Sequence, residues 1–265
     1  MSTLEVRNVV KQYHLRGGWR GSTLKAVNNV SFTLEAGKTV ALVGQSGSGK
    51  STIAKLLMQL ERPTSGLILL DGKPIQRHGS GLREYRNNVQ MVFQDPFASL
   101  NPFHTVEHHL ARPLLLHGKA SSGAEVRAGV RRLLERVRLE PVDDVAQRRP
   151  HELSGGQRQR VAIARALAPE PSVLVADEPV SMLDVSIRLG VLNLLASLQR
   201  EENLGVLYIT HDLATARHFS DEILVMYRGE IVERGPSDDV ILNPQHEYTA
   251  LLAESAPNPE KRLLR

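Results

Sequence analysis

One short stretch, residues 44–51 (GQSGSGKS), combines residue types and spacing that can do chemistry, and it matches the pattern G-x-x-x-x-G-K-S. Glycines at this spacing let the backbone wrap tightly and present N–H groups to phosphate oxygens. The apolar residues 39–43 before it predict a buried strand, and residues 52–58 after it predict a helix. The start of that helix adds free N–H groups and the positive end of its dipole. Strand, glycine loop and helix in this order indicate a phosphate-binding site, called the P-loop below.

Within the P-loop we expect Lys50 to reach the β- and γ-phosphates of a nucleotide, and the Ser51 hydroxyl to coordinate Mg²⁺. The simpler alternative is a glycine-rich turn, and the flanking strand and helix argue against it. The pattern predicts nucleotide binding without saying what the nucleotide is used for.

Another apolar segment, residues 172–176, is followed directly by two acids, Asp177 and Glu178. In P-loop proteins an aspartate at such a strand end holds Mg²⁺, directly or through water. Glu178 would accept a proton from the attacking water or orient it. Two acids at an exposed strand end are common, so the catalytic interpretation depends on the P-loop earlier in the chain.

Two further polar residues follow predicted strands. Gln94 comes after the strand 89–93, and its amide can reach Mg²⁺ and water. His211 comes after the strand at 205–209, and it can donate to a γ-phosphate or hold Glu178 and water in register. Taken alone, each is more simply a strand-end residue without a role in chemistry.

The most discriminating motif is residues 153–157 (LSGGQ). Ser154 is a predicted N-cap, and its hydroxyl, two glycines and a helix start make a second phosphate-binding surface. One nucleotide does not need two such surfaces in one chain. Two chains facing head to tail do need them, because each P-loop would be closed by the serine–glycine turn of the other chain.

These groups must be positioned by a framework of alternating elements. The chain has 265 residues, of which 41% are hydrophobic, enough for a sizeable core. Buried strands that alternate with helices imply an α/β fold with a mostly parallel sheet. Antiparallel strands are mixed with the P-loop unit in the N-terminal part. Residues 105–139 predict an inserted helical lobe, and residues 17–22 and 141–150 predict loops.

Composition excludes several classes of protein. The chain has no cysteine, which excludes disulfides and thiolate metal sites and suits a reducing compartment. No signal-peptide segment is present, and no run approaches the roughly 18 apolar residues of a membrane span. The formal charge is +4, but the lysines and arginines are spread along the chain, so we expect no nucleic-acid partner. We expect a soluble, cytoplasmic protein.

Over residues 3–253 the order of these motifs resembles that of the ATP-binding-cassette (ABC) ATPases. The motifs are the P-loop, Gln94, residues 153–157, the strand ending at Asp177, residues 181–184 (SMLD) and His211. The resemblance implies a P-loop NTPase core with a mostly parallel sheet, an N-terminal antiparallel β-subdomain and a helical lobe at about 98–165, followed by a tail at 254–265. It also implies an ATPase with ATP and Mg²⁺ as cofactors, which closes as a sandwich of two chains.

The resemblance assigns roles to single residues. Tyr13 resembles the aromatic residue that stacks on adenine, Glu178 the catalytic base, His211 the switch histidine and Asp184 part of the loop that crosses the dimer. The implied catalytic residues are Glu178, His211 and Gln94, and the implied metal ligands are Ser51, Gln94 and Asp177. The implied nucleotide contacts are Tyr13, Gly44, Ser46, Gly47, Ser48, Gly49, Lys50, Ser51, Thr52, Ser154, Gly155, Gly156, Gln157 and Asp184.

Three segments resemble the oligopeptide, dipeptide and nickel importer ATPases more closely: residues 94–102, 177–186 and 243–249. This resemblance implies a peripheral subunit at the cytoplasmic face of the inner membrane that powers import of peptides, nickel or related small solutes. The implied partners are integral-membrane permeases, a second ABC ATPase (a copy or a paralogue) and, indirectly, an extracytoplasmic substrate-binding protein. Many members of this group carry a longer tail with cysteines, which this chain lacks, so no iron–sulfur cluster is expected.

Other classes of P-loop protein share some of these motifs. A soluble ABC ATPase in a metabolic enzyme assembly, of the carbon–phosphorus lyase type, would carry much the same motifs, and only its partners would distinguish it. DNA-repair ABC ATPases are split by a long coiled coil, and no heptad run occurs here. ABC proteins of translation carry two cassettes in one chain. A lone P-loop kinase would not explain the second phosphate-binding surface.

Overall fold

The computed structural model describes residues 2–15 and 22–255. The chain forms two compact units: a first unit from residues 1–75 and 206–265, and a second unit from residues 76–205. The loop predicted at 17–22 lies outside the described residues except for Ser22, which begins a strand. The predicted tail is described only to Ser255, where the last helix ends.

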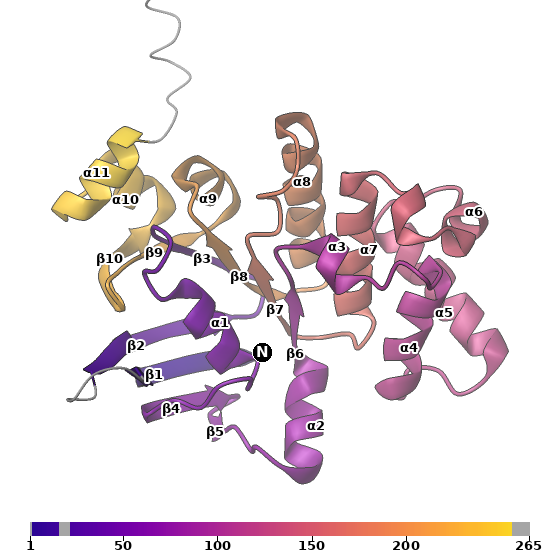
Figure 1. Cartoon of the computed structure of the whole chain (residues 1–265), viewed down its shortest axis with the longest axis horizontal. Coiled ribbons are helices and arrows are strands. Elements are labelled where there is room, and N and C mark those ends of the chain that lie inside the picture. Colours follow the sequence, from indigo (N-terminus) through magenta and orange to yellow (C-terminus); the bar gives the residue numbers. More distant parts are fainter. Residues whose placement is uncertain (1, 16–21, 256–265) are drawn as a thin grey trace, which may run out of the picture. The chain divides into compact units, whose positions relative to one another are not determined.

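The first unit contains an antiparallel sheet with the strand order β2–β1–β4–β5 (Figure 1). Its alternating apolar residues, such as Leu4 and Val6, are buried, as expected for strands with one face against a core. Asp71 and Gly72 form the predicted tight turn, both with positive φ. The strands are β1 (Thr3–Leu15), β2 (Ser22–Glu35), β4 (Ser65–Leu70) and β5 (Lys73–Pro74).

The first unit also contains strands in the order β10–β9–β3–β8, in which β3 is parallel to both β8 and β9. All residues of β3 and β8 are buried, which is why both are continuous apolar runs in the sequence. The strands are β3 (Thr39–Val43), β8 (Gly205–Thr210), β9 (Glu222–Tyr227) and β10 (Glu230–Pro236). The helices are α1 (Lys50–Leu57), α9 (Leu213–Phe219), α10 (Ser237–Leu242) and α11 (Glu247–Ser255).

The second unit places two parallel strands, β6 (Val89–Val92) and β7 (Val173–Asp177), beside a set of helices. The helices are α2 (Gly79–Asn88), α3 (Pro96–Ser99), α4 (Val106–Leu116), α5 (Gly123–Arg136), α6 (Val142–Gln147), α7 (Gly155–Leu167) and α8 (Val185–Glu201), with a 3₁₀ turn at Pro150–Glu152. Together with the first unit this is the α/β fold expected, with a mostly parallel sheet and an antiparallel N-terminal sheet.

One local prediction was wrong: residues 141–150 are not a loop, because α6 occupies most of them. The segment is too short and polar for an apolar repeat to be visible. Its helix is favoured by Asp143 and Asp144, whose charges lie in the first turn next to the positive end of the dipole. Val145 and Ala146 supply the buried face.

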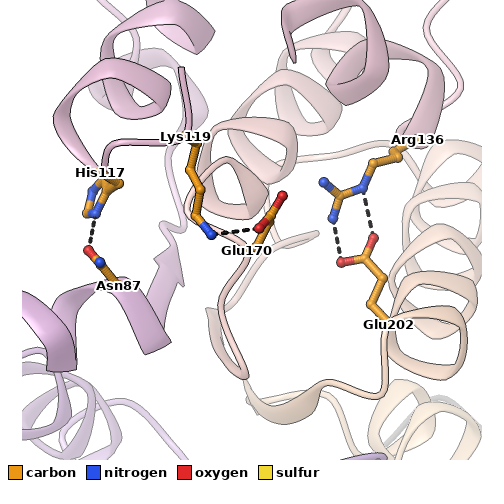
Figure 2. Close-up of polar contacts among 6 residues, drawn as sticks. All are labelled: Asn87, His117, Lys119, Arg136, Glu170 and Glu202. Atoms are coloured by element: carbon orange, nitrogen blue, oxygen red, sulfur yellow. Dashed lines mark hydrogen bonds and ion pairs between the residues drawn. The ribbon is translucent and has the colours of Figure 1, made fainter. Parts of the chain in front are cut away.

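Three polar contacts hold the ends of α4 and α5 in the second unit (Figure 2). Beyond α4, His117 Nδ1 lies 2.5 Å from Asn87 Oδ1, and Lys119 Nζ lies 2.6 Å from Glu170 Oε2. At the end of α5, the Arg136 guanidinium donates to both carboxylate oxygens of Glu202, with Nε at 2.9 Å from Oε1. Each contact joins residues at least 30 positions apart, so together they fix these helices to α2, to the segment after α7 and to the end of α8.

Candidate functional site

The P-loop connects β3 to α1, as predicted, and two of its glycines are required by close packing. A Cβ on Gly44 would lie 2.3 Å from the carbonyl oxygen of Met226, and one on Gly49 would lie 2.3 Å from that of Ala26. Gly49 also has a φ of 114°, which side-chain-bearing residues rarely adopt. The loop therefore wraps against neighbouring backbone at two points, where only glycine fits.

Lys50 is buried in the loop it follows, and its Nζ donates to the carbonyl oxygens of Gly44 (2.6 Å) and Gln45 (3.0 Å). Within the described residues, the backbone N–H groups of Gly47, Gly49 and Ser51 donate to no protein group. N–H donors, a helix start and a lysine in one tight loop suit a polyphosphate. The residues present therefore fit the nucleotide that the sequence predicted.

His211 and the P-loop follow strands that end at the same edge of the sheet. Val43, the last residue of β3, pairs with Thr210, the last residue of β8. Because the two strands are parallel, the residues that follow them leave the sheet side by side. The register of the first unit thus brings His211 toward the start of the P-loop.

The second unit uses the same geometry for Gln94, Asp177 and Glu178. Val92 in β6 pairs with Ala176 in β7, so the residues that follow them meet at one edge. There the Gln94 side-chain amide donates to Glu178, with Nε2 at 3.1 Å from Oε2. Two residues 84 positions apart, each interpreted as catalytic, are in direct contact.

The backbone at Glu178 adopts a left-handed conformation, with a φ of 44°. For a residue with a Cβ this conformation costs on the order of 1 kcal/mol. The Glu178 carbonyl oxygen accepts hydrogen bonds from the N–H (3.2 Å) and the hydroxyl (3.0 Å) of Ser181. These two bonds hold the strained backbone and so fix the direction of the side chain.

Ser154 is the N-cap of α7, as predicted. Its hydroxyl accepts from the N–H of Gln157 while the Gln157 side chain accepts from the N–H of Ser154, which completes a capping box. A Cβ on Gly156 would lie 2.6 Å from Cγ2 of Ile187, so this glycine lets α7 pack against the start of α8. Asp184 occupies the N-cap position of α8 without a capping bond from its side chain.

Tyr13 lies in β1, where it pairs with Leu24. The Lys11 ammonium lies 4.7 Å from the centre of its ring, a cation–π contact. The ring is half-buried and belongs to the first unit, like the P-loop.

A groove of about 1060 Å³ lies in the second unit, next to Gln94. One wall is polar and comes from α4 and the loop before it: the rings of His104 and His108 stack with centres 4.0 Å apart, and Arg112 follows. A slight loss of hydration, and then the charges of His104 and Arg112, lower the pKa of the exposed His108. Phe93, Leu115 and Leu116 are exposed apolar residues that also line the groove. The sequence assigned no role to these histidines.

Sequence reasoning missed Tyr248, whose side chain touches the P-loop. The hydroxyl oxygen of Tyr248, in α11, accepts a hydrogen bond from the backbone N–H of Gln45 at 2.9 Å. Residues 243–249 had been noted as a segment typical of importer ATPases, but no residue type there indicated a chemical role. A contact between side chain and backbone across 203 positions leaves no local pattern.

Within residues 2–15 and 22–255, no group of three or more histidine, cysteine and acidic side chains could hold a metal ion. None of the helices in that part of the chain is long and apolar enough to cross a membrane.

Comparisons with known proteins identify the family. Residues 27–181 match the family model described as ABC transporter. The chain is 46% identical over 259 residues to the Di/tripeptide transport ATP-binding protein DppF of Pseudomonas aeruginosa (strain UCBPP-PA14), covering 97% of this chain and 79% of that protein. It is 45% identical over 264 residues to the Oligopeptide transport ATP-binding protein AppF of Bacillus subtilis (strain 168), covering 98% of this chain and 79% of the relative.

A solved structure agrees with both. It is the dimeric ATP-binding cassette MJ0796 in a post-hydrolysis state bound to ADP and Pi, which matches with a TM-score of 0.76 and 32% identity over 88% of this chain and 98% of that chain. With the P-loop, the LSGGQ turn and the Gln94–Glu178 pair in place, the chain belongs to the ABC transporter family, whose ATP-binding cassette it carries.

Proposed function

We propose that this chain is the ATP-hydrolysing subunit of an ABC importer that takes up short peptides. The hydrogen bond from Gln94 to Glu178 carries the ATPase part of the proposal, because it presents a carboxylate base in a fixed position at the strand edge. The peptide substrate class is supported by the names of the two relatives, which are 45–46% identical along nearly the whole chain.

In the proposed reaction, the P-loop N–H groups and Lys50 hold the phosphates, and Tyr13 packs on the adenine. Glu178 accepts the proton of the attacking water at its carboxylate, and Gln94 and His211 hold that water and the γ-phosphate in place. Bound Mg²⁺ would offset the negative charge of the phosphates. Ser51, Gln94 and Asp177 supply oxygen atoms, the ligand type that Mg²⁺ prefers.

Two chains are proposed to share each nucleotide. Ser154, Gly155, Gly156 and Gln157 form a capped helix start that can donate to a phosphate, and α7 is long enough to have an effective dipole. ATP would stabilise the closed pair, and hydrolysis would release it. The dimeric cassette matched above is a solved example of two such chains together.

The proposed partner in the groove is a cytoplasmic helix of a membrane permease. Exposed apolar residues that line the groove, such as Leu116 (79% exposed) and Phe93 (43% exposed), suit the apolar face of a helix. The cationic Arg112 suits an acidic side chain on that helix. This partner would place the chain at the cytoplasmic face of the membrane, with a second ABC ATPase and, indirectly, a substrate-binding protein.

A pull-down of the tagged chain from detergent-solubilised membranes, followed by mass identification, tests the proposal. The expected result is two multi-span permeases, with or without a second cassette ATPase. Leu116→Asp in the groove should abolish their recovery. Leu60→Asp, at a comparably exposed leucine in the first unit (64% exposed), should not. An eluate with only soluble enzymes would reject the transport role.

A further inference from the structure

The C-terminal helix α11 makes a hydrogen bond to the P-loop. The phenolic oxygen of Tyr248 accepts from the backbone N–H of Gln45 at 2.9 Å, and the tyrosine is only 6% exposed. Gln45 itself is exposed, so this bond fixes the backbone of a loop residue whose side chain is not packed. The phenol is buried and its oxygen accepts this one N–H. It therefore fixes the position of the loop backbone at Gln45.

Tyr248 is held in place by the β9–β10 hairpin. Its ring packs on that of Tyr227, with centres 4.2 Å apart. Glu233 in β10 accepts from the backbone N–H groups of Gln245 (2.8 Å) and His246 (3.0 Å), which lie just before α11. Burial raises the pKa of the Glu233 carboxyl, but these two N–H groups, the Thr249 side chain and the charge of His246 together lower it below its usual value. The start of α11 is therefore anchored at two points.

The same hairpin holds the P-loop at two other points. The carbonyl oxygen of Met226 lies against Gly44, where no Cβ fits, and the N–H of Gly229 donates to the carbonyl oxygen of Ser48 at 2.9 Å. Tyr248 adds the contact at Gln45, which lies between these two residues. The loop is thus supported at Gly44, Gln45 and Ser48, and the contact at Gln45 comes from the Tyr248 side chain.

The bond acts on a peptide group that Lys50 also contacts. The N–H of Gln45 and the carbonyl of Gly44 belong to the same planar peptide unit. The N–H of this unit donates to Tyr248, and its carbonyl oxygen accepts from Lys50 Nζ at 2.6 Å. Since the unit is rigid, a hydroxyl that fixes one end also fixes the direction of the other.

We propose that Tyr248 is a positioning residue of the nucleotide site, which acts through the Gly44–Gln45 peptide on Lys50. It does not touch the nucleotide; it sets the shape of the empty loop, so that ATP binds to a loop already formed. The C-terminal helix thereby influences nucleotide affinity. This inference rests on the proposed ATP site, and its test is chosen to separate the two.

The test replaces the hydroxyl alone. Tyr248→Phe keeps the ring and its packing on Tyr227, and leaves the Gln45 N–H without its acceptor. Tyr227→Phe is the matched control, because it removes the other hydroxyl of the same ring pair. Among the described residues the Tyr227 hydroxyl makes no hydrogen bond. Dissociation constants for ATP and ADP are measured with a fluorescent nucleotide, and kcat and KM by phosphate release.

The expected result is ATP and ADP binding about three- to tenfold weaker in Tyr248→Phe, as for the loss of one hydrogen bond. KM should rise by a similar factor, with kcat at saturating ATP within about twofold of wild type. In the nucleotide-free protein, the Gln45 amide hydrogen should exchange faster, measured by NMR. In a Lys50→Met background, the added effect of Tyr248→Phe on affinity should largely disappear.

Unchanged nucleotide affinity in Tyr248→Phe, or an equal loss in Tyr227→Phe, would overturn the inference. Unchanged exchange of the Gln45 amide would also reject it, and this measurement needs no nucleotide. If the wild-type chain did not bind ATP, the proposed function would fail, while the exchange rate would still report on the Tyr248–Gln45 bond.

Discussion

The side chains of Gln94 and Glu178 are joined by a hydrogen bond of 3.1 Å between Nε2 and Oε2. Both residues follow strands whose last paired residues, Val92 and Ala176, are in parallel register. The amide donates to one oxygen of the carboxylate and so fixes the orientation of the group. A base held in this way needs no rearrangement of its own before it accepts a proton.

Glu178→Gln should keep ATP binding and reduce turnover by at least about 10²-fold, because an amide cannot accept the proton of the attacking water. The substitution preserves size, and glutamine at this position can still accept from the Gln94 amide. Phosphate release at saturating ATP and the dissociation constant of a fluorescent ATP analogue are the measurements. Turnover at the wild-type rate would remove Glu178 from its role.

Ser154→Arg should leave ATP binding at the P-loop of the same chain largely intact and block closure of the two chains. The arginine would fill the surface that we propose faces the nucleotide of the other chain. The substitution also removes an N-cap, which costs about 1 kcal/mol of stability by itself. Closure is measured by sedimentation, as ATP-dependent dimerisation of the Glu178→Gln protein with and without Ser154→Arg.

Ser122→Arg is the matched control for this experiment. Ser122 caps α5 with the same capping box, made with Glu125, and it is outside the LSGGQ turn. It should lose similar stability and still dimerise with ATP. If Ser154→Arg abolished ATP binding altogether, the shared site would be rejected.

Gly49→Ala should lower the free energy of unfolding by more than about 2 kcal/mol and abolish nucleotide binding. A methyl group there would lie 2.3 Å from the Ala26 carbonyl oxygen. Gly72→Ala is the comparison, because Gly72 also has a positive φ, 73°, but no atom lies within 4 Å of its added Cβ. It should cost only the strain of the backbone, about 1 kcal/mol. If urea unfolding showed equal losses of unfolding free energy in the two variants, the close approach at Gly49 would be relieved by movement of its neighbours.

Stability should fall as the pH is lowered below about 6.5, partly because of His117. Burial first, and then the charge of Lys119, lower the pKa of His117 in the folded protein. On acidification the unfolded chain therefore takes up this proton before the folded chain does, which favours unfolding. Urea unfolding at pH 7.5 and 5.5 should show the difference.

His117→Gln should flatten part of this pH dependence, because the substitution removes the group whose pKa is lowered in the folded protein. Some dependence should remain in His117→Gln, because burial also lowers the pKa of His109. An identical slope in wild type and His117→Gln would contradict the assignment.

The elements that hold the site could be predicted where burial imposes a pattern. The apolar runs of β3, β7 and β8 marked the strands, and their ends marked Gly44, Asp177 and His211 as neighbours of a sheet edge. The N-cap at Ser154 was readable because capping is local chemistry. The roles assigned to these residues remain predictions.

The rest depends on tertiary contact. Helix α6 forms because Val145 and Ala146 find a buried surface, which a short polar segment does not reveal. The bond from the Gln45 N–H to the Tyr248 oxygen joins the two chain segments of the first unit, and a tyrosine in a helix gives no sign of such a partner. The stacked histidines of the groove likewise have no spacing typical of a known site.

The left-handed backbone of Glu178 has a consequence for protein engineering. Glycine and asparagine tolerate such a φ better than glutamate does, so replacing Glu178 with either should make the folded chain more stable. Directed evolution that selects only for thermostability would therefore favour these substitutions, and the variants would lack the carboxylate base. Libraries built on this chain should hold residue 178 fixed, or screen for turnover and stability together.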